Sequence, residues 1–451
     1  RKKSEVDQDL HPNDQHPGNI GNNHVVYVDD PTEPTEIVGY RKNNNWFDAS
    51  GAQIDDPNIL AFQTQGGTIA PYLQAETTEN LQISPESFKD YEPEVTVMPR
   101  IAFSFPISDE ANFFANYDVL TQRPQSGIIS NLDDYFYLEQ RSTGAIGNPG
   151  LKPQKRTNYE IGFKQKLTDN SALTLSAYYG EIRDLIQVVR VNQAFPISYN
   201  TFQNLDFGTV KGLTAVYDLR ESRNSNATFQ ANYTLQFAES TGSNATDQAS
   251  LISAGQPNLR TPFPKDNDVR HNLSTTFSYD FKESKDYTGP ITGDGTEILK
   301  NVGANLILEA RSGKPYSEQS NVNRTVSVGI RQQSNLEGGI NGARLPWNFN
   351  VDLRLDKDIK LTSQDQGDGR PTVLNIYFWI QNVFDTRNVL NVYSFTGDPD
   401  DDGFLSSREG QQVIESQVTQ QAYRDQYSIK VNNPNNYSTP RLIRVGAQLN
   451  F

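Results

Sequence analysis

The last twelve residues, "PRLIRVGAQLNF" (440–451), alternate between two kinds of side chain. One set is apolar or aromatic and the other is polar or glycine, and successive side chains of a β-strand point to opposite faces of a sheet. The stretches "WNFNVDLRLD" (347–356) and "LNIYFWIQ" (374–381) repeat the alternation. These segments therefore predict antiparallel strands with one apolar face and one polar face.

About eleven segments follow this pattern, and most are long. They lie near 95–106, 111–120, 157–167, 171–186, 207–219, 226–238, 268–282, 300–312, 344–357, 371–393 and 440–451. Globular strands are usually about five or six residues long, whereas about nine to eleven tilted residues cross a bilayer. The strand lengths favour an all-β transmembrane barrel.

The connections between these segments alternate between short and long. "ISDE" (107–110), "TDNS" (168–171) and "ESRNS" (221–225) are tight turns, and between them lie the long excursions 121–156, 187–206, 239–267, 313–343 and 394–439. Short turns at one rim and long extracellular loops at the other are typical of outer-membrane β-barrels. A large soluble β-sandwich or solenoid is the alternative, because it also shows polar and apolar alternation.

Composition excludes several classes of function. The chain carries 40 Lys and Arg against 55 Asp and Glu, a formal net charge of -15, which argues against a nucleic-acid partner. It has no cysteine, so a disulfide framework, a thiolate metal site and a cysteine nucleophile are all excluded. No nucleophile elbow, phosphate loop or zinc motif is present, and we expect no enzymatic activity.

The strand count predicts an incomplete barrel. Bacterial single-chain barrels have even strand numbers, whereas the eleven strands predicted here are an odd number. A barrel left open would expose a strand edge to lipid, which is very costly. We therefore expect residues 1–94 to form an extracellular loop region with small β elements, and residues 95–451 to be the C-terminal part of a longer barrel.

Several segments resemble the TonB-dependent receptors of Gram-negative outer membranes. "NPGLKPQKRTNYEIGFKQKLTDNSALTLSAYYGEIRDLI" (148–186) is similar to a segment and hairpin of that family, with Gln154 in place of the usual acid. "MPRIAFSFPISDEANFFANYDVLTQRP" (98–124), "DVRHNLSTTFSYDF" (268–281) and "IQNVFDTRNVLNVYSFTGDPDDDGFL" (380–405) most resemble the Oar-like subgroup of Bacteroidetes-type bacteria.

The resemblance implies a 22-stranded barrel of which this chain supplies the C-terminal half. It also implies an upstream plug domain, an upstream segment that contacts TonB, and active transport of a scarce or large substrate across the outer membrane. Outer-membrane lipid would surround the barrel, and surface lipoproteins or other outer-membrane proteins are further partners. The alternative function is a surface binding or scaffold barrel for secretion or adhesion, without active transport.

One long excursion contains the spacing of a calcium loop. "DPDDDGFLSSRE" (398–409) reads D-x-D-x-D-G-x5-E, the register of a twelve-residue calcium loop. The predicted ligands are Asp398, Asp400, Asp402, the Phe404 carbonyl, Ser406 and Glu409, with Gly403 at the sharp turn. Pro399 and the lack of a preceding helix depart from an EF-hand, whereas the polar stretch after the loop is predicted to be helical. We expect a structural calcium ion that orders the excursion 394–439; a merely acidic, solvated loop tip is the alternative.

Overall fold

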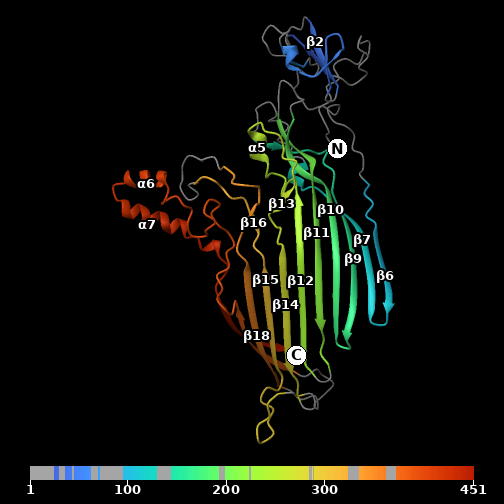
Figure 1. Cartoon of the computed structure of the whole chain (residues 1–451), viewed down its shortest axis with the longest axis vertical. Helices are drawn as coiled ribbons and strands as arrows, with labels where there is room; N and C mark the ends of the chain where they lie inside the picture. The colour runs from blue at the N-terminus through green and yellow to red at the C-terminus, as the bar shows by residue number, and fades with distance from the viewer. Residues whose placement is uncertain are drawn as a thin grey trace.

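One large antiparallel sheet dominates the chain (Figure 1). The computed structural model describes residues 25–29, 36–42, 45–61, 70–71, 95–129, 144–191, 199–222, 225–283, 287, 289–322, 335–361 and 372–450. Most of the opening 1–94, parts of the long excursions and Phe451 lie outside the described residues.

Eleven strands follow one another across the sheet, each paired with its neighbours in the chain. They are β6 (Arg100–Ser108), β7 (Ala111–Gln122), β9 (Gln154–Thr168), β10 (Ser171–Val191), β11 (Tyr199–Leu219), β12 (Ala227–Ser240), β14 (His271–Phe281), β15 (Val302–Arg311), β18 (Asn348–Lys360), β19 (Val373–Gln381) and β20 (Leu442–Asn450). β8 (Ala145–Ile146) pairs with β11, and β13 (Phe263–Pro264) pairs with β12. The eleven predicted strands are confirmed, and β6 and β20 form the two edges of the sheet.

The bounds of several strands differ from the prediction, among them β10, β11 and β19. The strand expected over 371–393 ends at Gln381, because Asn382 and Asp385 adopt φ angles of 54° and 53°. That left-handed conformation turns the chain out of the ladder. β10 and β11 are longer than expected at 21 residues each, which matters for the site described below.

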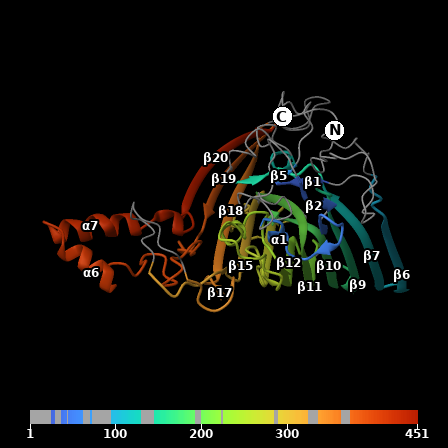
Figure 2. The same ribbon diagram turned by 90° about the horizontal axis from the view of Figure 1, so that it is seen from above.

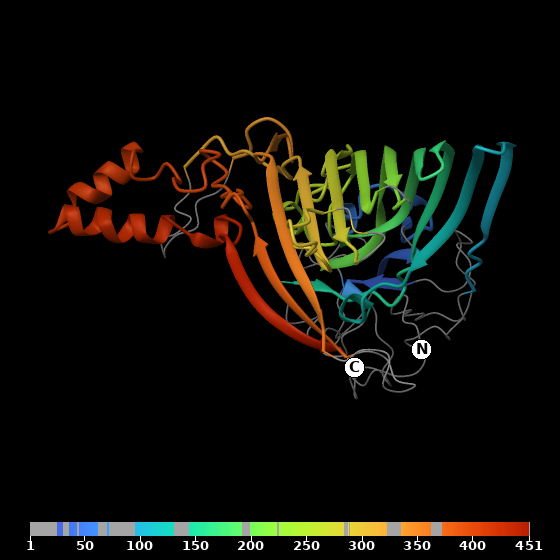
Figure 3. The same cartoon turned by 90° about the horizontal axis from the view of Figure 1, so that it is seen from below.

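The apolar face of the sheet is its convex face. Figures 2 and 3 show the sheet curving strongly from β6 to β20. On β10, apolar Leu175 and Tyr179 are exposed, whereas the alternating residues Ser176 and Tyr178 are half-buried. Side chains crowd together on the concave side of a curved sheet, so the polar face is the concave one. A soluble sheet would bury its apolar face instead.

Three aromatic side chains on the concave wall each cover a glycine of the next strand. Phe114 lies over Gly162, Tyr178 over Gly212 and Tyr377 over Gly446, so that a Cβ at these glycines would come within 2.1–2.5 Å of atoms of the aromatic side chains. Glycine weakens a strand, and a cross-strand aromatic compensates by filling the vacant space. The three pairs fix the register of the sheet at three places.

The two ends of the sheet differ as the sequence predicts. At the short-turn end, Asp109–Glu110 join β6 to β7, and Asp169–Asn170 join β9 to β10. The long-loop end carries several helices and further short strands. They are α3 (Ser126–Ile129), α5 (Ala249–Ser253), α6 (Arg408–Glu415), α7 (Gln420–Val431), the 3-10 helix η4 (Pro434–Asn436), β16 (Pro315–Tyr316) and β17 (Ala343–Arg344). Among the described residues, no helix is long and apolar enough to cross a membrane.

A separate small sheet lies beyond the long-loop end (Figure 1). Its order is β4-β3-β2-β1-β5, from β1 (Val25–Val28), β2 (Ile37–Lys42), β3 (Asn45–Asp48), β4 (Gln53–Ile54) and β5 (Ala70–Pro71), with helix α1 (Asn58–Ala61). Trp46 is buried against Tyr27, Val38 and Leu60. These elements lie within residues 1–94, whose assignment as an extracellular loop region stays a prediction.

Candidate functional site at the long-loop end

The hairpin of β10 and β11 projects beyond its neighbours. β9 pairs with β10 only as far as Arg183, and β12 pairs with β11 only as far as Gly208. The register shifts between Ile182 and Leu185, where Asp184 adopts a φ of 59°. Such a bulge bends a strand and redirects its side chains. The hairpin beyond it therefore lies outside the wall formed by the other strands.

The projecting hairpin has a hydrophobic core of its own. Five buried side chains from three regions of the chain form it: Leu151, Ile186, Val188, Phe202 and Ile252. Ile252 comes from α5, and Leu151 comes from the segment after β8. The long excursions around β10 and β11 are thus partly folded against each other.

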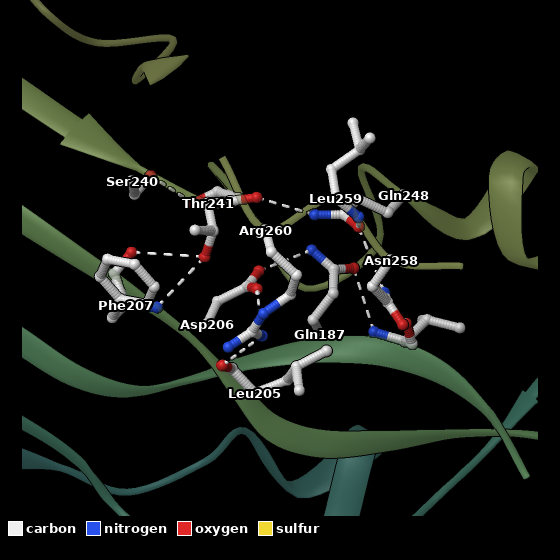
Figure 4. A network of polar contacts seen from close by, with 12 residues as sticks. Gln187, Leu205, Asp206, Phe207, Ser240, Thr241, Gln248, Asn258, Leu259 and Arg260 are labelled. Carbon is white, nitrogen blue, oxygen red and sulfur yellow. Dashed lines mark hydrogen bonds and ion pairs between the residues drawn. The ribbon is translucent and has the colours of Figure 1, made fainter. Parts of the chain in front are cut away.

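A buried polar network lies beside this core, centred on Gln187 (Figure 4). The Gln187 side-chain nitrogen lies within hydrogen-bonding distance of three acceptors: Asp206 Oδ2 at 3.1 Å, the Asn244 carbonyl oxygen at 3.1 Å and Asp247 Oδ1 at 2.6 Å. An amide nitrogen carries only two hydrogens. One of the three acceptors therefore lacks a hydrogen from Gln187.

Asp206 is the acceptor whose surroundings are least complete. Its side chain is 1% exposed, and its Oδ1 is buried with no hydrogen-bond partner. Arg260 Nη1 lies 3.9 Å from that oxygen and donates instead to the Leu205 carbonyl at 2.8 Å. Burial raises the pKa of Asp206 above its ordinary value, and the nearby Asp247 charge adds to the rise.

Gln248 fastens the loop that closes the network. Its side-chain nitrogen donates to the Thr241 carbonyl at 2.7 Å, and its oxygen accepts from the Leu259 amide at 2.8 Å. At Gly242 there is no room for a side chain, since a Cβ would lie 2.3 Å from Asp206 Oδ2. Sequence reasoning missed this network, because a single polar residue in a strand does not indicate its partner in a distant loop.

The predicted calcium loop is well folded, and its aspartates already have partners. Asp398 Oδ1 accepts from the Asp400 amide at 2.7 Å, and Asp400 Oδ2 accepts from the Tyr437 hydroxyl. Asp402 is 2% exposed and accepts from the Phe404 amide at 3.0 Å and from the Tyr427 hydroxyl at 2.5 Å.

The second half of the loop leads into α6. Phe404 is fully buried, its ring centroid 5.0 Å from that of Tyr427, and its carbonyl accepts from Ser407. The Ser406 hydroxyl donates to the Gly403 carbonyl at 3.1 Å. Glu409 lies in the first turn of α6, where its charge is favourable.

Two features of the loop match the prediction. Gly403 adopts a φ of 76°, as the sharp turn requires, and helices α6 and α7 follow the loop. Within the described ranges, however, no three acidic or histidine side chains are grouped closely enough to hold a metal. The ligand set therefore fits the ion only in part, and calcium binding stays a prediction.

Tyrosine hydroxyls hold the loop where metal coordination was expected. Burial raises the pKa of Tyr427, and its hydrogen bond to Asp402 raises it further. The hydrogen bond to Asp400 likewise raises the pKa of Tyr437. Both phenols thus stay protonated as donors at neutral pH.

The sequence of residues 79–383 matches a family model described as TonB dependent receptor-like, beta-barrel. The match covers more than half of the 451 residues. The chain belongs to this family. The TonB-dependent receptor resemblance and the all-β class are therefore confirmed, and membership places the chain in an outer membrane, in a family of receptors and not of enzymes.

Solved structures of outer-membrane proteins are similar to this chain at low sequence identity. The outer membrane transporter YddB from Escherichia coli is 14% identical, with a TM-score of 0.42, over 65% of this chain and 38% of its own. The pyoverdine receptor FpvA from Pseudomonas aeruginosa is 14% identical, with a TM-score of 0.41, over 67% and 33%. The FrpB iron transporter from Neisseria meningitidis is 15% identical, with a TM-score of 0.39, over 64% and 35%.

The chain spans about a third of the length of these solved receptors. No protein of curated function matches its sequence. The assignment to the family therefore rests on the family model.

Proposed function

We propose that this chain is the C-terminal half of the barrel of a receptor that transports a scarce or large substrate across the outer membrane, energised through TonB. The observation that carries the proposal is the family match over a meander whose concave wall is polar and whose convex face is apolar. A polar lumen inside an apolar outer band is the arrangement of transmembrane barrels. The long-loop end would face the cell exterior.

The edges β6 and β20 support the view that further strands complete the barrel. An unpaired edge in hydrocarbon leaves backbone groups without partners, each at a cost of several kcal/mol. We propose that eleven upstream strands close a 22-stranded barrel around an upstream plug, and that an upstream segment contacts TonB. Residues 1–94 would then be an extracellular region, and 95–451 the barrel portion.

The likeness of 380–405 to Oar-like receptors supports that subgroup as a finer assignment. The alternative function is a surface scaffold that binds a lipoprotein or another outer-membrane partner without transport. The folded excursions around α5, α6 and α7 are surfaces that either function could use.

The acidic loop 398–409 supports a second proposal, a structural calcium ion outside the cell. Gly403 already provides the turn that the register needs. Asp398, Asp400 and Glu409 would supply carboxylates, and Asp402, Phe404 and Ser406 would complete the set. The ion would draw these side chains together and neutralise their charge, and the protection of the loop from proteolysis by calcium tests this.

The depletion of solutes from growth medium separates transport from scaffolding. Cells that lack this gene and cells that lack TonB should fail to deplete the same solute, and the intact gene should restore depletion. A scaffold predicts instead that the surface protein content changes while every solute is depleted as in the parent strain. That second result would contradict the proposed transport.

A further inference from the structure

Three residues of the concave wall form one row across the last three strands. Arg354 on β18 is paired with Trp379 on β19, which is paired with Arg444 on β20. Residues that are paired across neighbouring strands lie on the same face, and strands are about 4.8 Å apart. The two arginines therefore flank the indole on one face, with backbones separated by about two strand spacings.

The row has a rigid aromatic base. The Arg444 guanidinium carbon lies 5.2 Å from the Trp379 ring centroid, and that of Arg354 lies 4.7 Å from the Tyr377 ring centroid. Tyr377 is held in place because it covers Gly446. Stacking on an aromatic face leaves the N–H groups at the guanidinium edge available to a ligand.

Among the described residues, the charges of the row are only partly neutralised. Arg354 Nε lies 3.8 Å from Asp356 Oδ1, a loose ion pair with 42% of the arginine side chain exposed. Arg444 is exposed, and no described carboxylate forms an ion pair with it. An arginine without a described carboxylate partner attracts an anionic ligand locally, although the chain as a whole carries a net charge of -15.

The wall toward the short-turn end has the opposite charge. Asp280 and Asp356 converge over Gly303, where a Cβ would lie 2.9 Å from Asp280 Oδ1 and 3.1 Å from Asp356 Oδ2. Asp358 is on the same wall, and its Oδ1 accepts from the Asn375 amide at 2.7 Å. An anion at the arginine row would therefore be repelled from the wall just beyond it.

We propose that Arg354, Trp379 and Arg444 form a binding station for the carboxylate or phosphate group of a solute in the lumen. Guanidinium groups match both anions with two parallel hydrogen bonds, and stacking on the Trp379 indole orients the Arg444 guanidinium. The inference rests on the proposed function, because it takes the concave wall to line a path for solutes.

Fluorine NMR of the full-length protein tests the station without requiring transport. With 5-fluorotryptophan incorporated, the Trp379 resonance is the one missing from Trp379→Phe. Citrate and pyrophosphate should each shift it to saturation, whereas sucrose should not. Arg444→Gln should raise the anion concentration at the midpoint of the titration at least tenfold. Arg354→Gln should raise it less, because Arg354 is already partly paired with Asp356.

Arg311→Gln is the matched control. Arg311 lies on the same wall but pairs with Glu309 at 3.1 Å, so the midpoint should stay unchanged. Arg444→Lys keeps the positive charge but loses the forked guanidinium group, and should give an intermediate midpoint. Heat-modifiable migration in gels checks that each variant folds as a barrel.

Two results would overturn the inference. One is a Trp379 resonance that neither anion shifts, which is also expected if a carboxylate of the same polypeptide occupies the row. The other is a midpoint that Arg444→Gln leaves unchanged. If the anions shift the Trp379 resonance to saturation but deletion of the gene alters no solute depletion, the proposed transport is contradicted and the anion-binding site is supported.

Discussion

The Tyr427 hydroxyl donates to Asp402 across 25 residues of sequence, at 2.5 Å, with both side chains buried. This bond joins α7 to the acidic loop and closes a core that also contains Phe404 and Val431. The excursion between β19 and β20 is therefore a folded unit, with its own core and its own polar contact.

Removal of that hydroxyl should loosen the unit. Tyr427→Phe leaves a buried Asp402 oxygen without its donor, which costs about 1–3 kcal/mol. Amide hydrogen exchange in α6 and α7 should accelerate accordingly. Tyr437→Phe removes a similar bond from an exposed carboxylate and serves as the control, with a smaller effect expected. Equal effects of the two variants would contradict the role given to burial.

Asp206 should make the projecting hairpin less stable as pH rises. Its pKa is raised in the folded state, so the folded state binds the proton more tightly than the unfolded state does. The contribution to stability is therefore greatest at acidic pH and is lost as pH rises from the ordinary aspartate range through the raised folded value.

Asp206→Asn mimics the protonated carboxyl and should abolish this pH dependence. The exchange rate of the Ile252 backbone amide between pH 4 and 8, corrected for the intrinsic exchange rate, measures the pH dependence of the stability of the projecting hairpin. The other charges near the network are those of Asp247, Arg260, Lys265, Asp266 and Arg156. Asp247→Asn is the control that should keep a pH dependence. Identical pH profiles for Asp206→Asn and the parent protein would exclude Asp206 as the source.

Gly446 should tolerate no side chain while Tyr377 lies over it. Gly446→Ala places a Cβ 2.4 Å from the Tyr377 ring, and such overpacking costs about 1–3 kcal/mol. The urea midpoint of the folded barrel should fall, as followed by heat-modifiable migration. Gly293→Ala is the control, because nothing lies within 4 Å of its Cβ position. A midpoint unchanged by Gly446→Ala would show that the ring moves aside freely.

Calcium should protect the acidic loop if the predicted ligands bind it. Extracellular calcium sites have dissociation constants of about 10⁻⁴–10⁻³ M, so millimolar calcium should slow proteolysis within 394–439 and a chelator should reverse the effect. Asp398→Asn with Asp400→Asn should remove the protection. If the loop is cleaved at the same rate with calcium, with chelator and in the double variant, the tyrosine contacts alone order it.

The strands could be read from the sequence because their signal is local. Alternation of side chains such as Phe378 and Trp379 sets the face of each residue without knowledge of its neighbours. The ends of strands were less predictable. Asn382 and Asp385 belong to the residue types that most often adopt the left-handed conformation, but that tendency alone does not locate the end of a strand. The extension of β10 depends on its pairing with β11.

The contacts that make the sites could not be read from the sequence. Gln187 meets Asp247 across 60 residues, and Arg444 meets Trp379 only because of the register between β19 and β20. The acidic loop shows the opposite case. Its spacing predicted the turn at Gly403, but not that Tyr427 and Tyr437 would hold two of its carboxylates.

The most direct test of the account is the environment of each face of β18 in a membrane. The chain has no cysteine, so single cysteines at 350–355 can carry spin labels one at a time in lipid vesicles. We predict that labels at Val351, Leu353 and Leu355 collide readily with dissolved oxygen, and that labels at Asn350, Asp352 and Arg354 do so far less. Accessibility without this period of two, or with the two faces exchanged, would contradict the claim that the concave wall lines a polar lumen.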